Sequence, residues 1–442
     1  MAQGFRIVIE TYDVSSNIID SREEIKNLKL VTPKHIEDVG LSHLEQIDVL
    51  QKTLDILVAN QGALIDEAGD CPSCGKTARK AGKTNSNFHS VYTDHKVKIV
   101  RRICSCGWGN KPTIEGKFGH SCHPDLLKKQ CENGAKQSYV KAEEVLTREN
   151  GRKRKVNNHM HISRIIESVG GVMSNLKCGN PLSKSKPADI IVAQIDGVHI
   201  KPRDKNKRSF EALAAKIYNP ENLVKKDKNH NVLTKSTCVI SALSDKGKTI
   251  KKQTVYAAKQ EGLSKETTAY VLADGAKNCW SAAKGLEGHC KKIVPILDWC
   301  HIGRKFKNVE QKIPENFHEA LERAKWSLWN GKADKCLNKI SKITKDLPAS
   351  VEDEKIIALK KYITRNTSNI INYAEQKKNA LPFTSSIIES GIDTLINQRQ
   401  NQTNKMQWTR EGAHNVLQIR ASQASNSWNE DWGKSLKILL AA

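Results

Sequence analysis

The sequence predicts an α+β protein of several domains, and three patterns support this prediction. Apolar segments of strand length recur between residues 189 and 297, with helical segments among the later ones. Residues 303–380 have an almost continuous helical pattern. A segment rich in cysteine, glycine and lysine, residues 69–122, precedes both. The chain of 442 residues exceeds one ordinary domain, and 38% hydrophobic residues are enough for buried cores.

Residues 1–68 form an acidic segment that we expect to begin irregularly and to continue as a helix. Asp and Glu outnumber Lys and Arg here, which is not so in the rest of the chain. Residues 1–30 show no clear periodicity. From Ser42 to Ile65 apolar residues recur at steps of three and four, which predicts an amphipathic helix. This helix either packs on the body of the protein, which we favour, or pairs with another copy.

Two pairs of cysteines predict a zinc ribbon over residues 69–124. Cys71 and Cys74 are separated by two residues, Cys104 and Cys106 by one, and a glycine follows each pair. Zinc binds four thiolates in a tetrahedron, and each close pair supplies two of them from one turn. Because such a site leaves no open position, we expect a structural Zn²⁺. The alternative interpretation is a loop with free thiols.

The remainder of the ribbon segment predicts short hairpins. Phe88–Val91 and Lys96–Ile103 alternate between apolar and polar residues, as strands do. His120, Cys122 and His123 are spaced for a further partial metal site, for which the sequence offers no clear fourth ligand. The other cysteines are expected to be free thiols, because a chain of this size in a reducing compartment does not need a disulfide framework.

Residues 125–182 predict a helix-turn-helix-like module. Helical patterns cover Gln137–Arg148 and His159–Leu176, and a polar, basic break separates them. The break contains four consecutive basic residues, which we expect to contact DNA phosphates: Arg152, Lys153, Arg154 and Lys155. The alternative is a helical linker with a basic loop.

The net charge of +24 favours a polyanionic partner, most commonly DNA or RNA. A basic surface that serves only solubility is the alternative. No apolar run reaches the roughly 20 residues of a membrane-spanning helix, and the first 20 residues lack the pattern of a signal peptide. We therefore expect a cytoplasmic protein without a membrane partner.

The segment after residue 183 predicts a sheet with helices. Three antiparallel-looking strands are followed by alternating helix and strand. The expected strands are Asp189–Ile195, Ser209–Tyr218, Thr237–Leu243, Lys248–Ala258, Tyr270–Ala273 and Lys292–Leu297, with a helix from Lys277 and a later one over Phe383–Gln398.

Three acidic residues follow strands or lie in the last of these helices. Asp196 and Asp274 each end an apolar strand and precede a glycine, and Glu389 lies in the helix Phe383–Gln398. Clustered carboxylates bind hard divalent cations, and two such ions suit phosphodiester chemistry. The sequence therefore predicts a site for two Mg²⁺ or Mn²⁺ ions. Taken singly, each Asp-Gly pair also suits an ordinary turn, and Asp298 competes with Asp274 because it too follows a strand.

A further element, Asp298-x-x-His301, precedes a basic helix. Arg304, Lys305 and Lys307 follow on that helix and are expected to lie near DNA. An ordinary turn at the end of a strand is the alternative for this element.

Together these motifs resemble the DDE transposases of bacterial insertion sequences, which have a ribonuclease-H-like core and are related to the Mutator-like group. The resemblance covers about residues 70–435. It rests on the Asp196-Gly and Asp274-Gly pairs, the Asp298-x-x-His301 element, the Glu389 helix, the paired cysteines and the tail from Asn404 to Arg420.

The resemblance implies a domain plan and a catalytic site. The ribonuclease-H-like core would comprise residues 183–302 and 381–420, with an all-helical insertion at 303–380 and a C-terminal tail at 421–442. Asp196, Asp274 and Glu389 would be the metal-binding triad, which favours Asp274 over Asp298, and His301 would contact DNA or support the active site.

The resemblance also implies a function. The protein would bind the terminal inverted repeats of its mobile element, cleave a DNA strand and join it to target DNA, as a homodimer or larger homo-oligomer at the bacterial nucleoid. A catalytically silent DNA-binding descendant, a structure-selective nuclease of the same fold and an RNA-binding factor are the rivals. Three tail aromatics, Trp408, Trp428 and Trp432, either stack on DNA bases or pack in a core or a dimer interface.

Overall fold

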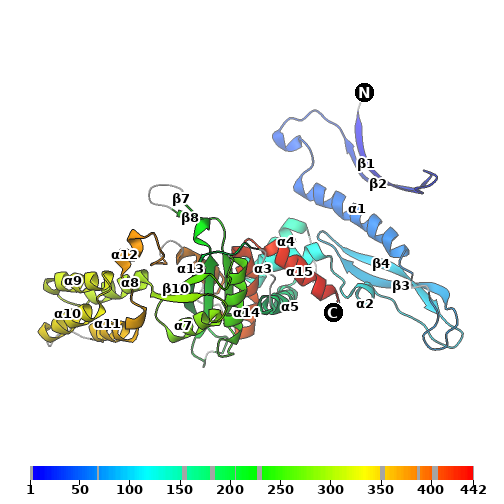
Figure 1. Cartoon of the computed structure of the whole chain (residues 1–442). Coiled ribbons are helices and arrows are strands. Elements are labelled where there is room, and N and C mark those ends of the chain that lie inside the picture. The colour runs from blue at the N-terminus through cyan, green and yellow to red at the C-terminus, as the bar shows by residue number, and fades with distance from the viewer. Residues whose placement is uncertain are drawn as a thin grey trace. The chain divides into compact units, whose positions relative to one another are not determined.

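A computed structural model of the chain (Figure 1) shows a mixed α and β protein that divides into two compact units. Unit 1 comprises Met1–Ile166 and Leu436–Ala442, and unit 2 comprises Glu167–Ser435. The structure describes residues 3–66, 69–151, 157–179, 185–204, 206–225, 231–348, 354–385, 389–400 and 407–441, without the side chains of residues 231 and 389–394. The domain boundaries expected from the sequence stay predictions.

Unit 1 begins with a β-hairpin where the sequence predicts irregular chain. Strand β1 (Gly4–Tyr12) pairs antiparallel with β2 (Ile19–Lys29). Asp13 stabilises the turn by accepting hydrogen bonds from the backbone of Ser15 and Ser16 at 3.0 and 2.7 Å. The prediction was wrong because both faces of this hairpin are largely exposed, so its strands lack the alternation of a half-buried sheet.

The predicted amphipathic helix is present and packs on the ribbon. A short 3₁₀ turn (Ile36–Asp38) precedes helix α1 (His43–Ala63), which begins at a capping box formed by Ser42 and Glu45. The helix packs on β4 (Asp94–Ile103), which pairs with β3 (Arg79–His89). The small core beneath it comprises Val97, Ile99 and Ile114, with Val58, Ile65 and Phe88 around them. The packing interpretation of this helix is therefore confirmed.

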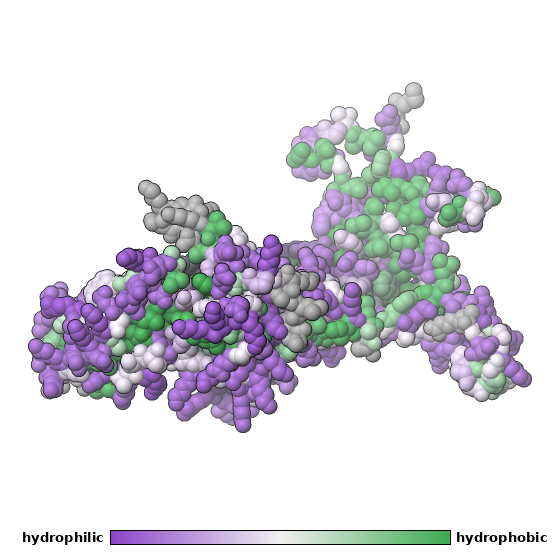
Figure 2. All heavy atoms as spheres, in the orientation of Figure 1, coloured by the Kyte–Doolittle hydropathy of each residue, from purple (hydrophilic) through white to green (hydrophobic). Residues whose placement is uncertain are grey.

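The first 64 residues nevertheless keep many large apolar side chains exposed. Leu44, Leu57 and Leu64 on or next to α1 are examples, and Leu64 is 83% exposed. Figure 2 shows hydrophobic residues gathered over this part of unit 1. These exposed side chains lie on the hairpin, on the loop after it and along α1.

Unit 1 continues with helices that include both helices of the predicted module. Gly134 leaves room for Ile162 and Ile166, which pack against it. The basic residues Arg152–Lys155 lie outside the described residues. The helices are α2 (Ile114–Phe118), α3 (Pro124–Lys136), α4 (Tyr139–Asn150) and α5 (His159–Cys178), and the last of these runs across the division between the units.

Unit 2 is built on a five-stranded mixed sheet. In the order β11-β10-β5-β6-β9, the first three strands are mutually parallel, and β6 and β9 continue the sheet antiparallel. A small hairpin of β7 (Leu223–Lys225) and β8 (Asn231–Leu233) lies outside this sheet. The strands of the main sheet are β5 (Ile190–Ile200), β6 (Phe210–Tyr218), β9 (Thr237–Ser241), β10 (Thr268–Ala273) and β11 (Lys292–Leu297).

The two faces of the sheet belong to different cores. Alternate residues of a strand face opposite sides, so Ile191, Ala193 and Ile195 pack with α6 (Lys248–Gln260) and α7 (Lys277–Ala283). Val192, on the other face, packs with the helices that follow β11. Helices therefore cover both faces.

One predicted strand is instead a helix. Lys248–Ala258 was expected to be a strand. The segment contains several β-branched residues and one tyrosine, which are common in strands. In α6 the buried residues Ile250, Thr254 and Ala257 recur at helical steps and pack under the sheet. Burial of that helical face overrides the strand propensity of the segment.

The helical character predicted for residues 303–380 is confirmed. Figure 1 shows these helices, in yellow to orange, grouped at one end of unit 2. They are followed by α13, α14 and α15 in the C-terminal part. The bounds are α8 (Trp299–Glu310), α9 (His318–Trp329), α10 (Ala333–Asp346), α11 (Glu354–Arg365), α12 (Tyr373–Lys378), α13 (Glu389–Gln400), α14 (Arg410–Ala424) and α15 (Trp428–Ala441).

The tail tryptophans pack internally. Trp408, Trp428 and Trp432 are all buried, with 8, 8 and 6% of their surface exposed. The Trp428 and Trp432 rings pack together with their centroids 5.7 Å apart. Because buried rings cannot receive a base, the stacking alternative for these residues was wrong.

Candidate functional site

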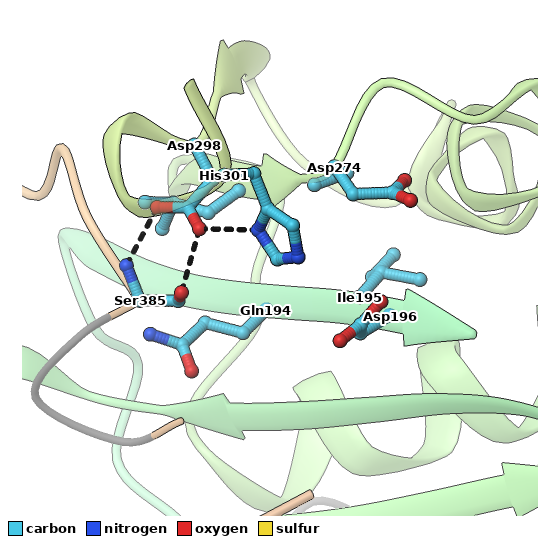
Figure 3. A pocket seen from close by; sticks show the side chains of 9 residues that line it. Gln194, Ile195, Asp196, Asp274, Asp298, His301 and Ser385 are labelled. Carbon is cyan, nitrogen blue, oxygen red and sulfur yellow. Dashed lines mark hydrogen bonds and ion pairs between the residues drawn. The ribbon is translucent and has the colours of Figure 1, made fainter. Parts of the chain in front are cut away.

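The register of the parallel strands brings three aspartates to one level of the sheet. Ala273 of β10 pairs with Ile195 of β5 and with Leu297 of β11. The next residue on each strand line is Asp196, Asp274 or Asp298. Neighbouring strands lie about 4.8 Å apart, so the three residues follow one another at this level of the sheet. They line one hollow together with His301 and Ser385, which we call the acidic hollow (Figure 3).

Asp298 is an anchoring residue whose two oxygens already accept hydrogen bonds. Its Oδ1 accepts from the backbone N–H of Ser385 at 2.8 Å, and its Oδ2 accepts from the Ser385 hydroxyl at 2.6 Å and from Nδ1 of His301 at 2.7 Å. The residue is 1% exposed and caps α8. Burial would raise the pKa of Asp298, but these hydrogen bonds outweigh it and hold the pKa below its usual value.

His301 is oriented by Asp298. Because the ionised carboxylate can only accept, Nδ1 of His301 donates to it, and the ring lies on the side of Asp298 that faces Asp196 and Asp274 (Figure 3). Burial lowers the pKa of His301, whereas Asp298 and the other two aspartates raise it further, so the net pKa lies above the usual value. The imidazole can therefore carry a proton in the acidic hollow.

The sequence predicted that Asp196 follows the end of its strand. In the structure Asp196 instead lies within β5, which continues to Ile200. Its Oδ1 accepts a hydrogen bond from the N–H of Gly197 at 2.8 Å. Burial raises the pKa of Asp196, His301 opposes this, and Asp274 and Asp298 raise the pKa further. A partly buried carboxylate beside two others is a site where a cation relieves repulsion.

Asp274 lies in a rigid turn after β10. Its Oδ1 accepts from the N–H of Ala276 at 2.8 Å, and its backbone oxygen accepts from the Tyr362 hydroxyl at 2.9 Å. Gly275 has φ +93°, and a side chain there would lie 2.7 Å from Asn366. The helical segment therefore contacts this turn through the Tyr362 hydroxyl, and Asn366 lies beside Gly275; the sequence analysis identified neither residue.

Glu389, the third expected acid, is the first residue of α13, and its side chain is outside the described part of the chain. The exposed residues Arg304, Lys305 and Lys307 lie on α8, and the ammonium of Lys305 lies 4.5 Å from the centre of the Tyr362 ring. The role of these residues at DNA stays a prediction.

The four cysteines of unit 1 meet as a zinc site requires. Their sulfur atoms all lie within 4.8 Å of one another, and Cys71–Cys106 and Cys74–Cys104 are each 3.5 Å apart. Sulfurs bound at 2.3 Å around one tetrahedral zinc would be roughly 3.8 Å apart, whereas a disulfide would need about 2.05 Å. The cluster can therefore bind zinc.

The partial site expected at His120, Cys122 and His123 is not assembled. His123 caps α3 through the N–H of Asp125, and Nδ1 of His120 accepts from the N–H of Cys122 at 2.9 Å. Among the residues that the structure describes, only the four cysteines place three or more ligand atoms this close together. The aspartates of the acidic hollow do not, which is compatible with Mg²⁺, since that ion keeps several waters and uses few protein ligands.

Comparisons with known proteins give little further information. No family model matches the chain, and no curated protein matches it. Among solved structures, the Drosophila P element transposase strand transfer complex is similar at a TM-score of 0.23 and 9% identity, over 72% of this chain and 80% of that one. A TM-score this low does not establish a shared fold. None of the described helices is long and apolar enough to span a membrane.

Proposed function

We propose that this protein is a DNA transposase that cleaves DNA at the ends of a mobile element and joins them to target DNA. The observation that carries the proposal is the acidic hollow, where Asp196 within β5 and Asp274 directly after β10 lie at one level of neighbouring parallel strands and Asp298 holds His301 beside them. We further propose that the core is ribonuclease-H-like and that the chain is related to transposases of bacterial insertion sequences. The sheet, three antiparallel strands followed by two parallel ones, supports this.

The aspartates have different tasks in this proposal. Asp196 and Asp274 bind the metal ions, because Asp298 already accepts hydrogen bonds on both oxygens. Glu389 is the third ligand, brought by α13. Two Mg²⁺ or Mn²⁺ ions bound there would activate the attacking oxygen and stabilise the leaving oxygen.

His301 acts on the phosphate. Its Nδ1 proton is committed to Asp298, so Nε2 is the ring nitrogen available to the DNA. The raised pKa keeps the imidazole protonated more often than in water. A protonated Nε2 donates a hydrogen bond to a phosphate oxygen and holds the backbone beside the two aspartates.

Recognition and assembly belong to unit 1 in this proposal. The zinc cluster stabilises the ribbon, and the ribbon with helices α4 and α5 reads the terminal inverted repeats, with Arg152–Lys155 on the phosphates. The exposed apolar residues of the first 64 residues form a homodimer or larger assembly. Two DNA ends must be held together for strand transfer, which such an assembly provides.

The test uses purified full-length protein, Mg²⁺ and labelled DNA carrying the inverted repeats that flank the gene. We expect nicking at the repeat tip followed by joined products. Both should disappear in Asp196→Asn and persist in Asp189→Asn, a matched change on an exposed residue just before β5. Cleavage without joining would indicate a structure-selective nuclease, and binding without cleavage in Mg²⁺ or Mn²⁺ would indicate a silent DNA-binding protein.

A further inference from the structure

A second hollow of unit 2 has a basic rim. It measures about 490 Å³ and lies between the loop that follows β5 and the segment that leads into α14. Two backbone hydrogen bonds tie these walls together, from Trp408 N–H to Lys201 O at 3.1 Å and from Arg203 N–H to Trp408 O at 2.9 Å. We call it the basic hollow; it is lined by Arg203, Lys207, Arg208 and Arg410, with Asp204, Phe210 and Trp408 among the other residues.

Positive charge exceeds negative charge in this hollow. All four basic side chains are exposed. Asp204 contacts Lys207 at 3.6 Å. Among the described residues, no carboxylate lies within ion-pair distance of the three arginines, so their charge is available to an anionic ligand.

The floor of the hollow favours a phosphate over a base. The Arg410 guanidinium lies 4.8 Å from the centre of the Phe210 ring, and that of Arg399 lies 4.6 Å from the Trp408 ring. Both rings are buried, so their faces are not available for stacking. Arg410 also donates to the backbone oxygen of Ala242 at 3.0 Å, which holds its guanidinium in place. Fixed guanidinium groups suit phosphate oxygens.

The basic hollow and the acidic hollow lie at different positions along the same pair of strands, β5 and β6. Ile200 pairs with Phe210 at the edge of the basic hollow, four residues beyond the pair of Asp196 and Ala214. At about 3.3 Å per residue the two pairs are roughly 13 Å apart. Because a duplex rises about 3.4 Å per base pair and its phosphates also wind around the axis, phosphates bound at the two hollows would lie only a few nucleotides apart.

We propose that the basic hollow binds the phosphate backbone of DNA a few nucleotides from the phosphate that is cut. The inference rests on the proposed function for the identity of the polyanion and for the reference point. The hollow fixes the strand lengthwise, so that only one phosphate lies at Asp196 and Asp274. It would therefore set the position of the cut and add affinity for any DNA sequence.

The test compares two charge-matched variants of the full chain on a labelled duplex bearing the inverted repeat. Arg203→Gln with Arg208→Gln removes two rim charges. The control variant, Lys284→Gln with Lys292→Gln, also removes two exposed charges. Lys284 precedes β11 and Lys292 is its first residue, so Lys292 lies at the opposite end of this strand from Asp298. If each arginine contacts one phosphate, the slope of log K against log salt should fall by about 1.8 and Kd at 0.1 M salt should rise roughly 60-fold.

A second measurement locates the contact. Single neutral methylphosphonates are placed at successive positions from the cut, and their effect on wild-type binding is measured. We expect the largest loss at one position a few nucleotides from the cut, and no such position in the arginine variant. Equal affinities and slopes for the two variants would overturn the inference while leaving the transposase proposal intact. Failure of the wild-type protein to bind DNA would overturn both proposals. If the wild-type protein binds DNA without cutting it, and the arginine variant binds more weakly, the result would support the role of the basic hollow and refute the proposed catalysis.

Discussion

Replacing Asp298 by asparagine tests whether this residue orients His301 and Ser385 or binds a metal ion. Asparagine keeps one oxygen, which can still accept from the Ser385 N–H. The amide group replaces Oδ2, which in the native protein accepts from His301 Nδ1 and the Ser385 hydroxyl. The hydroxyl can rotate to accept from the amide, but the Nδ1–H of His301 then faces another donor. One charge-assisted hydrogen bond is therefore lost in a site that is 1% exposed.

The magnitude follows from that single loss. A hydrogen bond to a charged group contributes about 1.5–3 kcal/mol, and a buried donor left unmatched adds to the loss, so we expect destabilisation by about 2–3 kcal/mol. For a unit of this size each kcal/mol lowers Tm by about 2–4 °C, so Tm should fall by roughly 4–12 °C. The mismatch is relieved only if His301 gives up its Nδ1 proton, so the pKa of His301 should also fall.

The assay combines thermal unfolding of the full-length variant, Mn²⁺ titration by calorimetry and NMR titration of His301. Asp298→Asn should lose stability and keep Mn²⁺ affinity. Asp196→Asn should behave in the opposite way, because burial and neighbouring carboxylates oppose the ionised form of Asp196. An Asp298→Asn protein with unchanged Tm and abolished Mn²⁺ binding would refute the reasoning and make Asp298 the second metal ligand.

Three other predictions follow from the structure. Cys106→Ser should lower the bound zinc, measured by elemental analysis, and unfold unit 1 at lower temperature; unchanged zinc content would exclude this cluster. The raised pKa of His301 predicts stabilisation that is complete below about pH 6.5 and is lost as pH rises through the folded-state pKa, while the lowered pKa of Asp298 predicts stabilisation above about pH 3.8 that is lost as pH falls. Tm of the wild type minus that of Asp298→Asn should be largest between these limits, and a difference independent of pH would contradict this. Gly275→Ala should destabilise by about 1–3 kcal/mol in urea unfolding, because φ is +93° and the added carbon would lie 2.7 Å from Asn366; a neutral effect would show that the turn after Asp274 is not rigid.

The central part of the sheet was predictable from sequence because its strands are buried on both faces. Such strands appear as continuous apolar runs, and the first polar residue after each run marks the edge of the sheet. Asp274 and Asp298 were found in this way, and Asp196 was found although its strand continues to Ile200. The cysteine spacing was equally informative, since four ligands from two turns leave few alternatives.

The remaining features depend on interactions that sequence periodicity does not express. Ser385 and Tyr362 act on the site through a hydroxyl and a backbone group, and residues of these types occur throughout the chain. The hydrogen bonds of Asp298 could not be expected either, because its partner Ser385 is distant in sequence. From the strand pattern alone Asp298 and Asp274 looked equivalent, and only the family resemblance favoured Asp274.

The wide spacing of the site along the chain has a consequence during synthesis. β5 can pair with β6 and β9 as soon as these emerge, but the acidic hollow also needs β10, β11 and Ser385. At 5–20 residues per second, roughly 10–40 s separate the appearance of Asp196 from that of Ser385. The ribbon and its zinc cluster are complete before Asp196 is made. A nascent chain therefore has all four zinc-site cysteines long before the acidic hollow can form, and a ribosome that stops before Ser385 releases a protein in which Asp298 lacks this hydrogen-bond partner.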